Sequence, residues 1–349
     1  MTPPAILQLL QTLISTPSFS REETATADVI FDYLTAAQLS PKRHLNNVYA
    51  LGQHNSPQKK TLLLCSHHDT VRPAAGYTRD PFAPDIQDGK LYGLGGNDAG
   101  ASVVSLIDCF STFYNKNLPF NLVLAIVAEE EVQGPNGVES ILPLLGNMDC
   151  AIVGEPTQMQ AAVGERGLMV LDCTAHGVQG HAARNEGKNA LYLALDDIEW
   201  IRQFAFPKIS ATMGQVKMTA TMMQCGTQHN VVPAECQFVV DVRPTDAYSN
   251  EEILQIIQQH CQSTVTPRST RLRASSIAAN HPLVQAAVQI GCSTYISPTT
   301  SDIALLHLPA LKMGVGNSAR SHAADEFVYL HEIDEGIARY KQLVDSLRA

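Results

Sequence analysis

The segment TLLLCSHHDTV (residues 61–71) decides the fold class, because it is a short apolar run that ends in a polar cluster. Such a run is typical of a buried strand, and in open α/β sheets functional side chains collect at the carboxyl ends of strands. His67 lies at this end, and Asp69 would lie on the same side two residues later. Asp69 could then hydrogen-bond the second imidazole nitrogen of a metal-bound His67. Taken alone, this His-x-Asp pair is more simply explained as a capped strand end.

Two further apolar runs also end in carboxylates. The run NLVLAIVA (residues 121–128) continues into Glu129, Glu130 and Glu131, and CAIV (residues 150–153) is followed by Gly154 and Glu155. Three adjacent carboxylates usually form a solvated turn, but at the end of an apolar strand a divalent cation compensates for their charge. One Glu could then bind metal while its neighbour serves as general base.

Asp98 and His322 lie in glycine-bearing loops. The loop LYGLGGNDAG (residues 91–100) precedes a helical pattern, and its spacing fits neither the dinucleotide fingerprint nor the P-loop. Alone, Asp98 would be interpreted as a helix N-cap, and His322, after MGVGNSARS (residues 313–321), would be unremarkable. Together with His67, Glu131 and Glu155, these two residues would supply all the protein ligands of a two-metal hydrolase site.

The composition agrees with a soluble enzyme of the cytoplasm. The chain has 349 residues, more than the roughly 100 to 200 residues of one domain, so we expect two domains. Hydrophobic residues make up 45% and charged residues 17% of the chain, which is typical of a globular protein. The net charge of -10 argues against nucleic acid or an anionic membrane as partner. The eight cysteines show no CxxC spacing and are interpreted as reduced core thiols, and the start of the chain is interpreted as an amphipathic helix rather than a secretory signal.

The order of the patterns predicts a catalytic domain, residues 1–162 and 272–349, and a second domain inserted at residues 163–271. In the first stretch apolar strands alternate with helical patterns, which is typical of βαβ units and a largely parallel sheet. The inserted stretch differs, because three strand patterns and two helical patterns form a compact α+β unit. They cover residues 168–175, 189–206, 213–225, 235–243 and 250–261, and the capping box Ser249-x-x-Glu252 opens the last helix. The chain must then return to the first domain, because His322 is needed there.

These motifs resemble the acetylornithine deacetylase and succinyl-diaminopimelate desuccinylase family of dinuclear zinc aminoacylases and carboxypeptidases. The resemblance runs nearly end to end and rests, in order, on residues 66–71, 93–100, 129–131, 154–157, 180–183 and 321–326. It implies two divalent metal ions per chain, zinc foremost with cobalt or manganese as alternatives. It implies that Asp98 bridges the ions, with His67 and Glu155 on one and Glu131 and His322 on the other.

The same resemblance implies the roles of the remaining acidic residues. Glu130 would be the general base and Asp69 the partner of His67. The run of three Glu leaves Glu129 and Glu130 as an alternative pair of base and ligand. One departure stands out: the family often has Lys two positions after the bridging Asp, where this chain has Gly100. That Lys is not a ligand, so its absence would leave the metal site intact and mark a subfamily.

For the architecture, the resemblance implies a zinc-peptidase-like catalytic domain with a mixed, mostly parallel sheet flanked by helices. The insertion would be an α+β, ferredoxin-like lid and dimerisation domain. His181 would enter the partner's active site in a homodimer and stabilise the tetrahedral oxyanion, whereas the residues alone leave a surface-loop role equally open. Asn230 and Arg243 match substrate-contacting positions, and Arg166 is a weaker candidate. Arginine is suited to binding a carboxylate through two parallel hydrogen bonds.

The resemblance is nearest to the acetylornithine deacetylase branch, through NDAGAS (residues 97–102) and GNSARSH (residues 316–322). It implies hydrolysis of N2-acetylornithine to ornithine and acetate in arginine biosynthesis. N-acetylcitrulline, N-succinylornithine and N-succinylcitrulline are alternative substrates, while acetyl-lysine and small peptides are less favoured. A different class, a metal-free binding or scaffold relative, is disfavoured because no ligand or base is missing.

Overall fold

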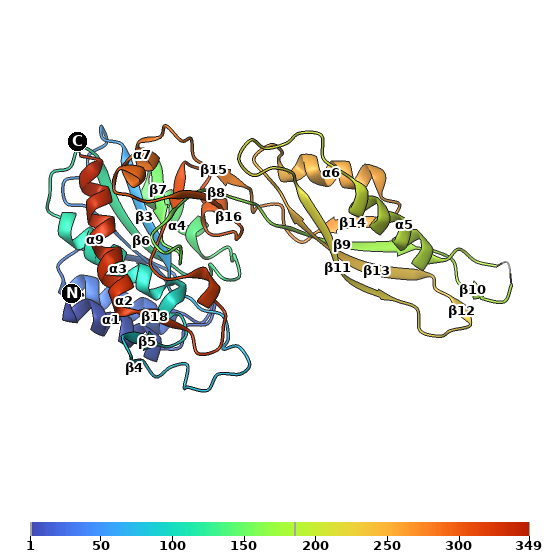
Figure 1. Ribbon diagram of the computed structural model, residues 1–349, viewed down its shortest axis with the longest axis horizontal. Coiled ribbons are helices and arrows are strands. Elements are labelled where there is room, and N and C mark those ends of the chain that lie inside the picture. Colours follow the sequence, from blue (N-terminus) through green and yellow to red (C-terminus); the bar gives the residue numbers. More distant parts are fainter. Residues whose placement is uncertain (1, 185, 349) are drawn as a thin grey trace. The chain divides into compact units, whose positions relative to one another are not determined.

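The computed structural model describes residues 2–184 and 186–348, which form two compact units (Figure 1). The first unit runs as far as Gly164 and resumes with Ser276–Ser297 and again from Ser301. The second unit comprises Glu165–Ser275 and Pro298–Thr300. The second unit is therefore an insertion into the first.

A nine-stranded mixed sheet forms the centre of the first unit, which confirms the predicted class. The strand order is β1-β2-β6-β3-β7-β17-β8-β15, with β16 paired to β8. Its strands are β1 (Lys42–His44), β2 (Asn47–Leu51), β3 (Thr61–His67), β6 (Asn121–Val127), β7 (Cys150–Val153), β8 (Ala161–Glu165), β15 (Ser275–Ser276), β16 (Thr294–Ser297) and β17 (Ala310–Lys312). Neighbours β6, β3, β7 and β17 run parallel, whereas β2 pairs antiparallel with β6 and β8 antiparallel with β17.

The central strands are mainly apolar, at residues 62–65 of β3 and 122–127 of β6, because both faces of the sheet are covered. Every residue of β3 and β6 is buried. In the parallel register, His67 lies opposite Val127 of β6, and Cys65 lies opposite Val153 of β7. The carboxyl ends of β3, β6 and β7 therefore meet at one edge of the sheet.

Helices of the first unit share one hydrophobic core with this sheet. The helices in this core are α1 (Pro4–Ser15), α2 (Thr24–Ala36), α3 (Ala101–Phe113), α7 (Pro282–Gln289) and α9 (Leu330–Ser346), whereas α4 (Val138–Leu145) and α8 (Ile303–Leu306) contact each other outside it. Figure 1 shows α3 and α9 side by side, and Phe110 of α3 and Tyr340 of α9 are both fully buried. The Tyr340 hydroxyl donates to the main-chain oxygen of Met313, 2.6 Å away, and so ties α9 to the segment after β17.

A separate three-stranded sheet joins two segments that are far apart in the sequence. It consists of β18 (Phe327–Tyr329), β5 (Lys90–Tyr92) and β4 (Ile86–Gln87), in that order. In the antiparallel register, Phe327 lies opposite Tyr92. The chain just before the glycine loop is thereby paired with the chain just after His322.

The second unit contains a four-stranded antiparallel sheet and two helices, so it has the two predicted helices and one strand, β14, beyond the three predicted strand patterns. The strand order is β11 (Lys217–Cys225), β13 (Glu235–Arg243), β9 (Met169–His176) and β14 (Thr264–Pro267). Apolar residues of this sheet form their own core with α5 (Ala190–Gln203) and α6 (Asn250–His260). The predicted capping box is present at the start of α6, because the Ser249 hydroxyl accepts from the Glu252 N–H and the Glu252 carboxylate accepts from the Ser249 N–H.

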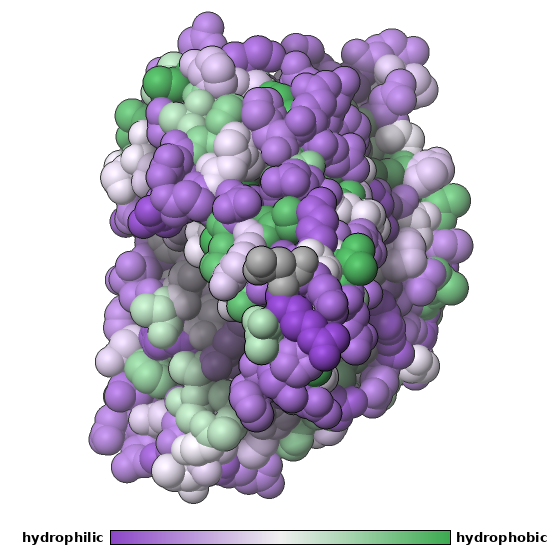
Figure 2. All heavy atoms as spheres, turned by 90° about the vertical axis from the view of Figure 1, so that its right-hand side faces the viewer, coloured by the Kyte–Doolittle hydropathy of each residue, from purple (hydrophilic) through white to green (hydrophobic). Residues whose placement is uncertain are grey.

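The second unit also contains a two-stranded ribbon. Strands β10 (Gly180–His181) and β12 (Val231–Val232) pair antiparallel. The face seen in Figure 2 is mainly hydrophilic, with hydrophobic side chains in small separate groups. Among the described residues, no helix is both long and apolar enough to cross a bilayer.

Candidate metal centre

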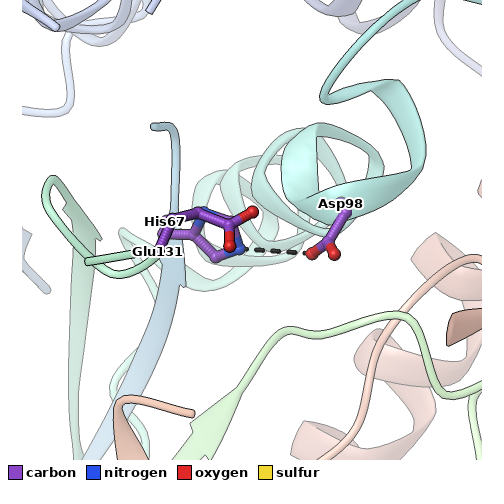
Figure 3. Close-up of side chains that lie close together, drawn as sticks. All are labelled: His67, Asp98 and Glu131. Atoms are coloured by element: carbon purple, nitrogen blue, oxygen red, sulfur yellow. Dashed lines mark ion pairs between the residues drawn. The ribbon is translucent and has the colours of Figure 1, made fainter. Parts of the chain in front are cut away.

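Three strand ends and two loops bring the five predicted ligands together. His67 is the last residue of β3, Glu131 lies in the turn after β6, and Glu155 comes two residues after β7. Asp98 lies in the short turn η1 (Gly96–Gly100) that precedes α3, and the peptide bond between Asp98 and Ala99 is cis. Figure 3 shows His67, Asp98 and Glu131 close together. The ligand atoms of these three residues all lie within 4.8 Å of one another, and the same holds for His67, Glu130 and Glu155.

Asp98 lies between two histidines. Its Oδ1 is 3.4 Å from Nε2 of His67, and its Oδ2 is 3.8 Å from Nε2 of His322. Each histidine has a further carboxylate of its own: Glu155 Oε1 lies 3.7 Å from His67 Nε2, and Glu131 Oε2 lies 3.0 Å from His322 Nε2. This arrangement suits a carboxylate that bridges two cations, each with its own histidine and glutamate.

Two buried polar atoms at the centre of the cluster support a metal site. His67 Nε2 and Glu155 Oε1 are both inaccessible to solvent and have no hydrogen-bond partner. Because Nδ1 of His67 donates to the main-chain oxygen of Asp69, 3.0 Å away, the neutral ring presents the lone pair of Nε2 to the carboxylates. Buried polar atoms are costly without a partner, and a divalent cation would satisfy both. Imidazole and carboxylate ligands suit zinc, cobalt and manganese.

The pKa values show how strongly these groups interact in the metal-free protein. Burial and the nearby Glu155 charge raise the pKa of Glu130 well above its usual value. Burial also raises the pKa of Glu155, to about 7. The hydrogen bond to Glu131 raises the pKa of His322 to about 9. The cluster therefore binds protons tightly, and divalent cations would have to displace them.

Asp69 holds the main chain of the two glutamates that follow β6. Its carboxylate accepts from the N–H groups of Glu130 and Glu131, at 3.0 and 3.1 Å, and from the Ser20 hydroxyl at 2.7 Å. The distance from its Oδ1 to His67 Nδ1 is 3.6 Å, which is too long for a hydrogen bond. Asp69 thus contacts His67 through its main-chain oxygen, while its side chain orients the Glu130-Glu131 turn. The sequence pattern pointed to Asp69 but not to this second role.

Glu129 and Glu130 face different surroundings. The Glu129 carboxylate accepts from the side-chain amide of Asn136 at 2.9 Å and from its main-chain N–H at 3.3 Å. A Cβ added to Gly134 would lie 1.7 Å from Glu129 Oε2, so this position has room only for glycine. Glu130 instead approaches the cluster, with Oε2 at 4.0 Å from His67 Nε2. This geometry favours Glu130 over Glu129 as the group that acts on a substrate.

Two buried charged residues near the cluster were not predicted. Lys312 of β17 is 5% exposed and Asp302 is 3% exposed. Burial and His67 have the larger effects on the pKa of Glu155, and the Lys312 charge lowers it. The Asp302 charge adds to burial in raising the pKa of Glu130. The sequence held one signal for these residues, the position of Lys312 at the end of a short apolar strand. A buried ammonium group usually has a charged partner, so this position could have indicated nearby carboxylates.

His181 and Asn230 lie on one ribbon in the second unit. The main-chain oxygen of Asn230 accepts from Ala182 N–H at 3.0 Å, next to the β10-β12 pair. The His181 side chain is exposed, and its Nδ1 accepts from Ala183 N–H at 3.1 Å. A neutral His181 ring therefore carries its proton on Nε2 and can donate it to an acceptor.

The predicted substrate-binding arginines already have partners within the second unit. Arg243 forms two parallel hydrogen bonds with Asp241, at 2.8 and 3.0 Å. Arg166 donates to the main-chain oxygens of Met213 and Gln215. A substrate carboxylate would have to share either guanidinium with these groups.

Comparison with known proteins identifies relatives along the chain. Residues 63–346 match the model of "Peptidase family M20/M25/M40". Succinyl-diaminopimelate desuccinylase of Xanthomonas campestris is 27% identical, over 98% of both chains, and its counterpart in Cereibacter sphaeroides is 25% identical, over 95% of this chain and 96% of the other. A tripeptidase of Staphylococcus aureus has a TM-score of 0.79 at 18% identity, over 99% of this chain and 98% of the other. A dinuclear metal-binding M20 peptidase of Bacillus subtilis has a TM-score of 0.73 at 15% identity, over 97% and 96%. At these identities the two structures establish the fold alone.

Proposed function

Because this chain belongs to the M20/M25/M40 peptidase family of metal-dependent amide hydrolases, we propose that it removes the acyl group from N-acyl amino acids. N2-acetylornithine is the first substrate we propose, with ornithine and acetate as products, in cytoplasmic arginine biosynthesis. The observation that carries the hydrolase proposal is the position of Asp98, whose two carboxylate oxygens face the rings of His67 and His322. The choice of acetylornithine is supported by residues 97–102 and 316–322.

The chain offers a complete ligand set for two divalent ions, of which zinc is our first candidate and cobalt and manganese are the alternatives. Asp98 would be shared, His67 and Glu155 would hold one ion, and Glu131 and His322 the other. Two such ions, when bound, polarise an amide carbonyl and lower the pKa of water. The positive charge of the ions would then balance the negative charge of the carboxylates in the cluster.

Glu130 is the residue we assign to proton transfer. It is 8% exposed, reaches the cluster without being one of the five ligands, and is held by Asp69 through its main-chain N–H. A general base works best when its pKa lies near the working pH, and burial raises the pKa of Glu130 in that direction. Glu130 would accept a proton from the attacking water and return it to the leaving amine. His181 would donate from Nε2 to the developing oxyanion.

N-succinyl amino acids are the second candidate class. The curated relatives named above are succinyl-diaminopimelate desuccinylases at 25% to 27% identity over nearly the full chain. A succinyl group carries a carboxylate that an acetyl group lacks, so its recognition calls for one more cationic or hydrogen-bonding group. Arg166 and Arg243 are the candidates for that contact. N-acetylcitrulline differs from N2-acetylornithine by a neutral side-chain end and remains an alternative within the first class.

We also propose that the protein is a homodimer in which His181 acts in the active site of the partner subunit. Strand β11 is an edge strand of the second unit. Large hydrophobic side chains are exposed on it and on α5, including Met222 and Met223 of β11 and Tyr192 and Leu195 of α5. Exposed strand edges and apolar side chains are common features of subunit contacts.

The substrate class is tested by kcat/KM of the zinc-loaded protein on five substrates: N2-acetylornithine, N-acetylcitrulline, N-succinylornithine, N-succinylcitrulline and N-succinyl-diaminopimelate. A higher kcat/KM for N2-acetylornithine supports the proposed deacetylase. A higher kcat/KM for any succinyl substrate would instead identify the protein as a desuccinylase. Metal analysis of the same sample should give two divalent ions per chain. A folded protein that holds no divalent ion and hydrolyses none of the five would contradict the enzyme proposal and favour a binding role.

A further inference from the structure

We propose that Glu326 is a positioning residue that fixes the bridging Asp98 relative to His322 before any metal binds. This inference rests on the proposed two-metal hydrolase function and extends it to a residue that is itself no ligand. Glu326 lies four positions after His322, yet its side chain reaches back into the chain around Asp98. The effect we assign to it is on metal affinity and on turnover, without a contact to substrate.

The Glu326 carboxylate accepts hydrogen bonds from three main-chain groups of the glycine loop. Oε1 accepts from Asn97 N–H at 2.9 Å and from Asp98 N–H at 3.0 Å, and Oε2 accepts from Gly95 N–H at 3.2 Å. The side chain is 2% exposed, and its own main-chain oxygen accepts from Gly93 N–H at 3.0 Å. Four N–H groups that no regular helix or strand satisfies are thereby bonded to one residue.

Asn97 makes a second, independent connection between the same two segments. Its side-chain oxygen accepts from Asn317 N–H at 2.9 Å, and its side-chain amide donates to Asn317 O at 3.1 Å. Gly316 has φ of +94°, and an added Cβ there would lie 2.4 Å from the Asn97 side-chain oxygen. The close approach of the two loops therefore depends on glycine at this position.

Together these hydrogen bonds connect the segment that carries Asp98 to the chain on both sides of His322. Asn317 comes before His322 in the chain and Glu326 comes after it, and both hold the segment that carries Asp98. The β5-β18 pairing continues the same connection beyond Glu326. His322 itself lies in a loop, with a side chain that is 54% exposed, so packing around the ring does not fix it. Its ring is bonded to Glu131, 3.0 Å away, and the position of its main chain relative to Asp98 depends on the hydrogen bonds of its neighbours.

The physical reason to expect an effect on metal is preorganisation. Groups that orient metal ligands from the outer shell typically change metal affinity or activity by roughly 10- to 100-fold when they are removed. In Glu326→Ala, the main-chain N–H groups of Gly95, Asn97 and Asp98 would lose their acceptor, and the loop with Asp98 would relax. In Glu326→Gln, the remaining oxygen can still accept from Asn97 and Asp98, while the new amide group opposes Gly95 N–H. The Gln variant should therefore show a smaller loss in the same direction.

The test is a calorimetric Zn²⁺ titration of chelator-treated protein, together with kcat and KM on the best substrate of the panel above. Asp197 provides a matched control in the second unit. It is 3% exposed, and its carboxylate accepts from the consecutive N–H groups of Gln262 and Ser263, at 2.9 and 2.8 Å. Asp197→Asn and Asp197→Ala thus remove a similar buried acceptor in the unit that contains none of the five ligands.

We expect Glu326→Ala to lose roughly 10- to 100-fold in affinity for at least one zinc ion and to lower kcat, with KM unchanged. The Asp197 variants should lower thermal stability but keep both zinc affinities. Wild-type zinc affinities in Glu326→Gln and in any folded Glu326→Ala protein would overturn the proposal, as would equal losses in the Asp197 variants. If the wild-type protein binds two zinc ions but hydrolyses no substrate in the panel, the substrate proposal fails and the titration still decides the role of Glu326.

Discussion

At the scale of single residues, Glu129 and Glu130 are neighbours whose carboxylates have different partners. Glu129 is bonded to Asn136, whereas Glu130 faces His67. We expect Glu130→Gln to lower kcat by roughly 100- to 10,000-fold, the usual contribution of a general base, and to retain both metal ions. Glu129→Gln is the matched control and should keep most of the activity. If Glu129→Gln lost activity and Glu130→Gln kept it, Glu129 and not Glu130 would be the general base.

The raised pKa values in the cluster predict how pH affects the metal-free protein. Glu155 has a pKa of about 7 in the fold against 4.5 as its ordinary value, so the folded state holds its proton more tightly. The stability from this group is fully present below pH 4.5 and is lost as the pH rises through about 7. His322, with a pKa of about 9, adds a similar loss above its ordinary value of 6.5.

Metal binding should reverse this pH dependence, because cations replace protons at the same ligands. We therefore expect the rise in Tm on adding Zn²⁺ to the chelated protein to be larger at about pH 8 than at about pH 5.5. Thermal unfolding with and without Zn²⁺ at both pH values measures this difference. An equal rise in Tm at the two values would contradict the linkage between protons and metal.

The sequence pointed to the cluster more readily than to the groups that hold it. His67, Glu131 and Glu155 were predictable as a set because each follows an apolar strand, and parallel strands present their carboxyl ends at one edge. Asn97 and Glu326 act through hydrogen bonds to main-chain groups of a distant segment. Such bonds leave no periodicity and no local spacing in the sequence, so Glu326 resembles any acidic residue in a turn.

At the scale of secondary structure, the start of α6 provides a separate test of stability in the second unit. The Ser249 side chain is the N-terminal cap of this helix, so its loss leaves the Glu252 N–H without an acceptor. We expect Ser249→Ala to lower the free energy of unfolding by about 1 kcal/mol. Denaturant unfolding measures this change, and an unchanged midpoint would show that the cap contributes nothing. Thr266→Ala, at an exposed position of β14, serves as a control.

Long elements were easier to predict than the partners of short strands. The apolar run of β3 and the helical pattern of α6 are determined by local sequence, and both appear close to the predicted bounds. The position of β17 between β7 and β8 was not predictable, because a strand of three residues is selected by its distant neighbours. The antiparallel pairing of β2 with β6 agrees with the mixed sheet that was expected, but which strands would pair antiparallel was not predictable.

At the scale of the whole molecule, the proposed exchange of His181 between subunits predicts complementation. Glu130→Ala and His181→Ala should each be nearly inactive. In a mixed dimer, one active site would combine the intact Glu130 of one chain with the intact His181 of the other. Unfolding and refolding an equal mixture should then restore about a quarter of wild-type activity, if the subunits pair at random. No recovery, in a mixture shown to contain mixed dimers, would place His181 in its own chain's site.

The position of β17 also has a consequence for the order in which the chain can fold during synthesis. Strand β8 reaches β7 only through β17, whose residues follow the whole second unit in the sequence. At ribosomal rates of about 5 to 20 residues per second, His322 emerges on the order of 10 s after Glu155. During that interval the second unit can fold around its own core, while β7 keeps an open edge. Ribosome-bound chains that stop before residue 310 should therefore contain a protease-resistant second unit beside a first unit that is still cleaved.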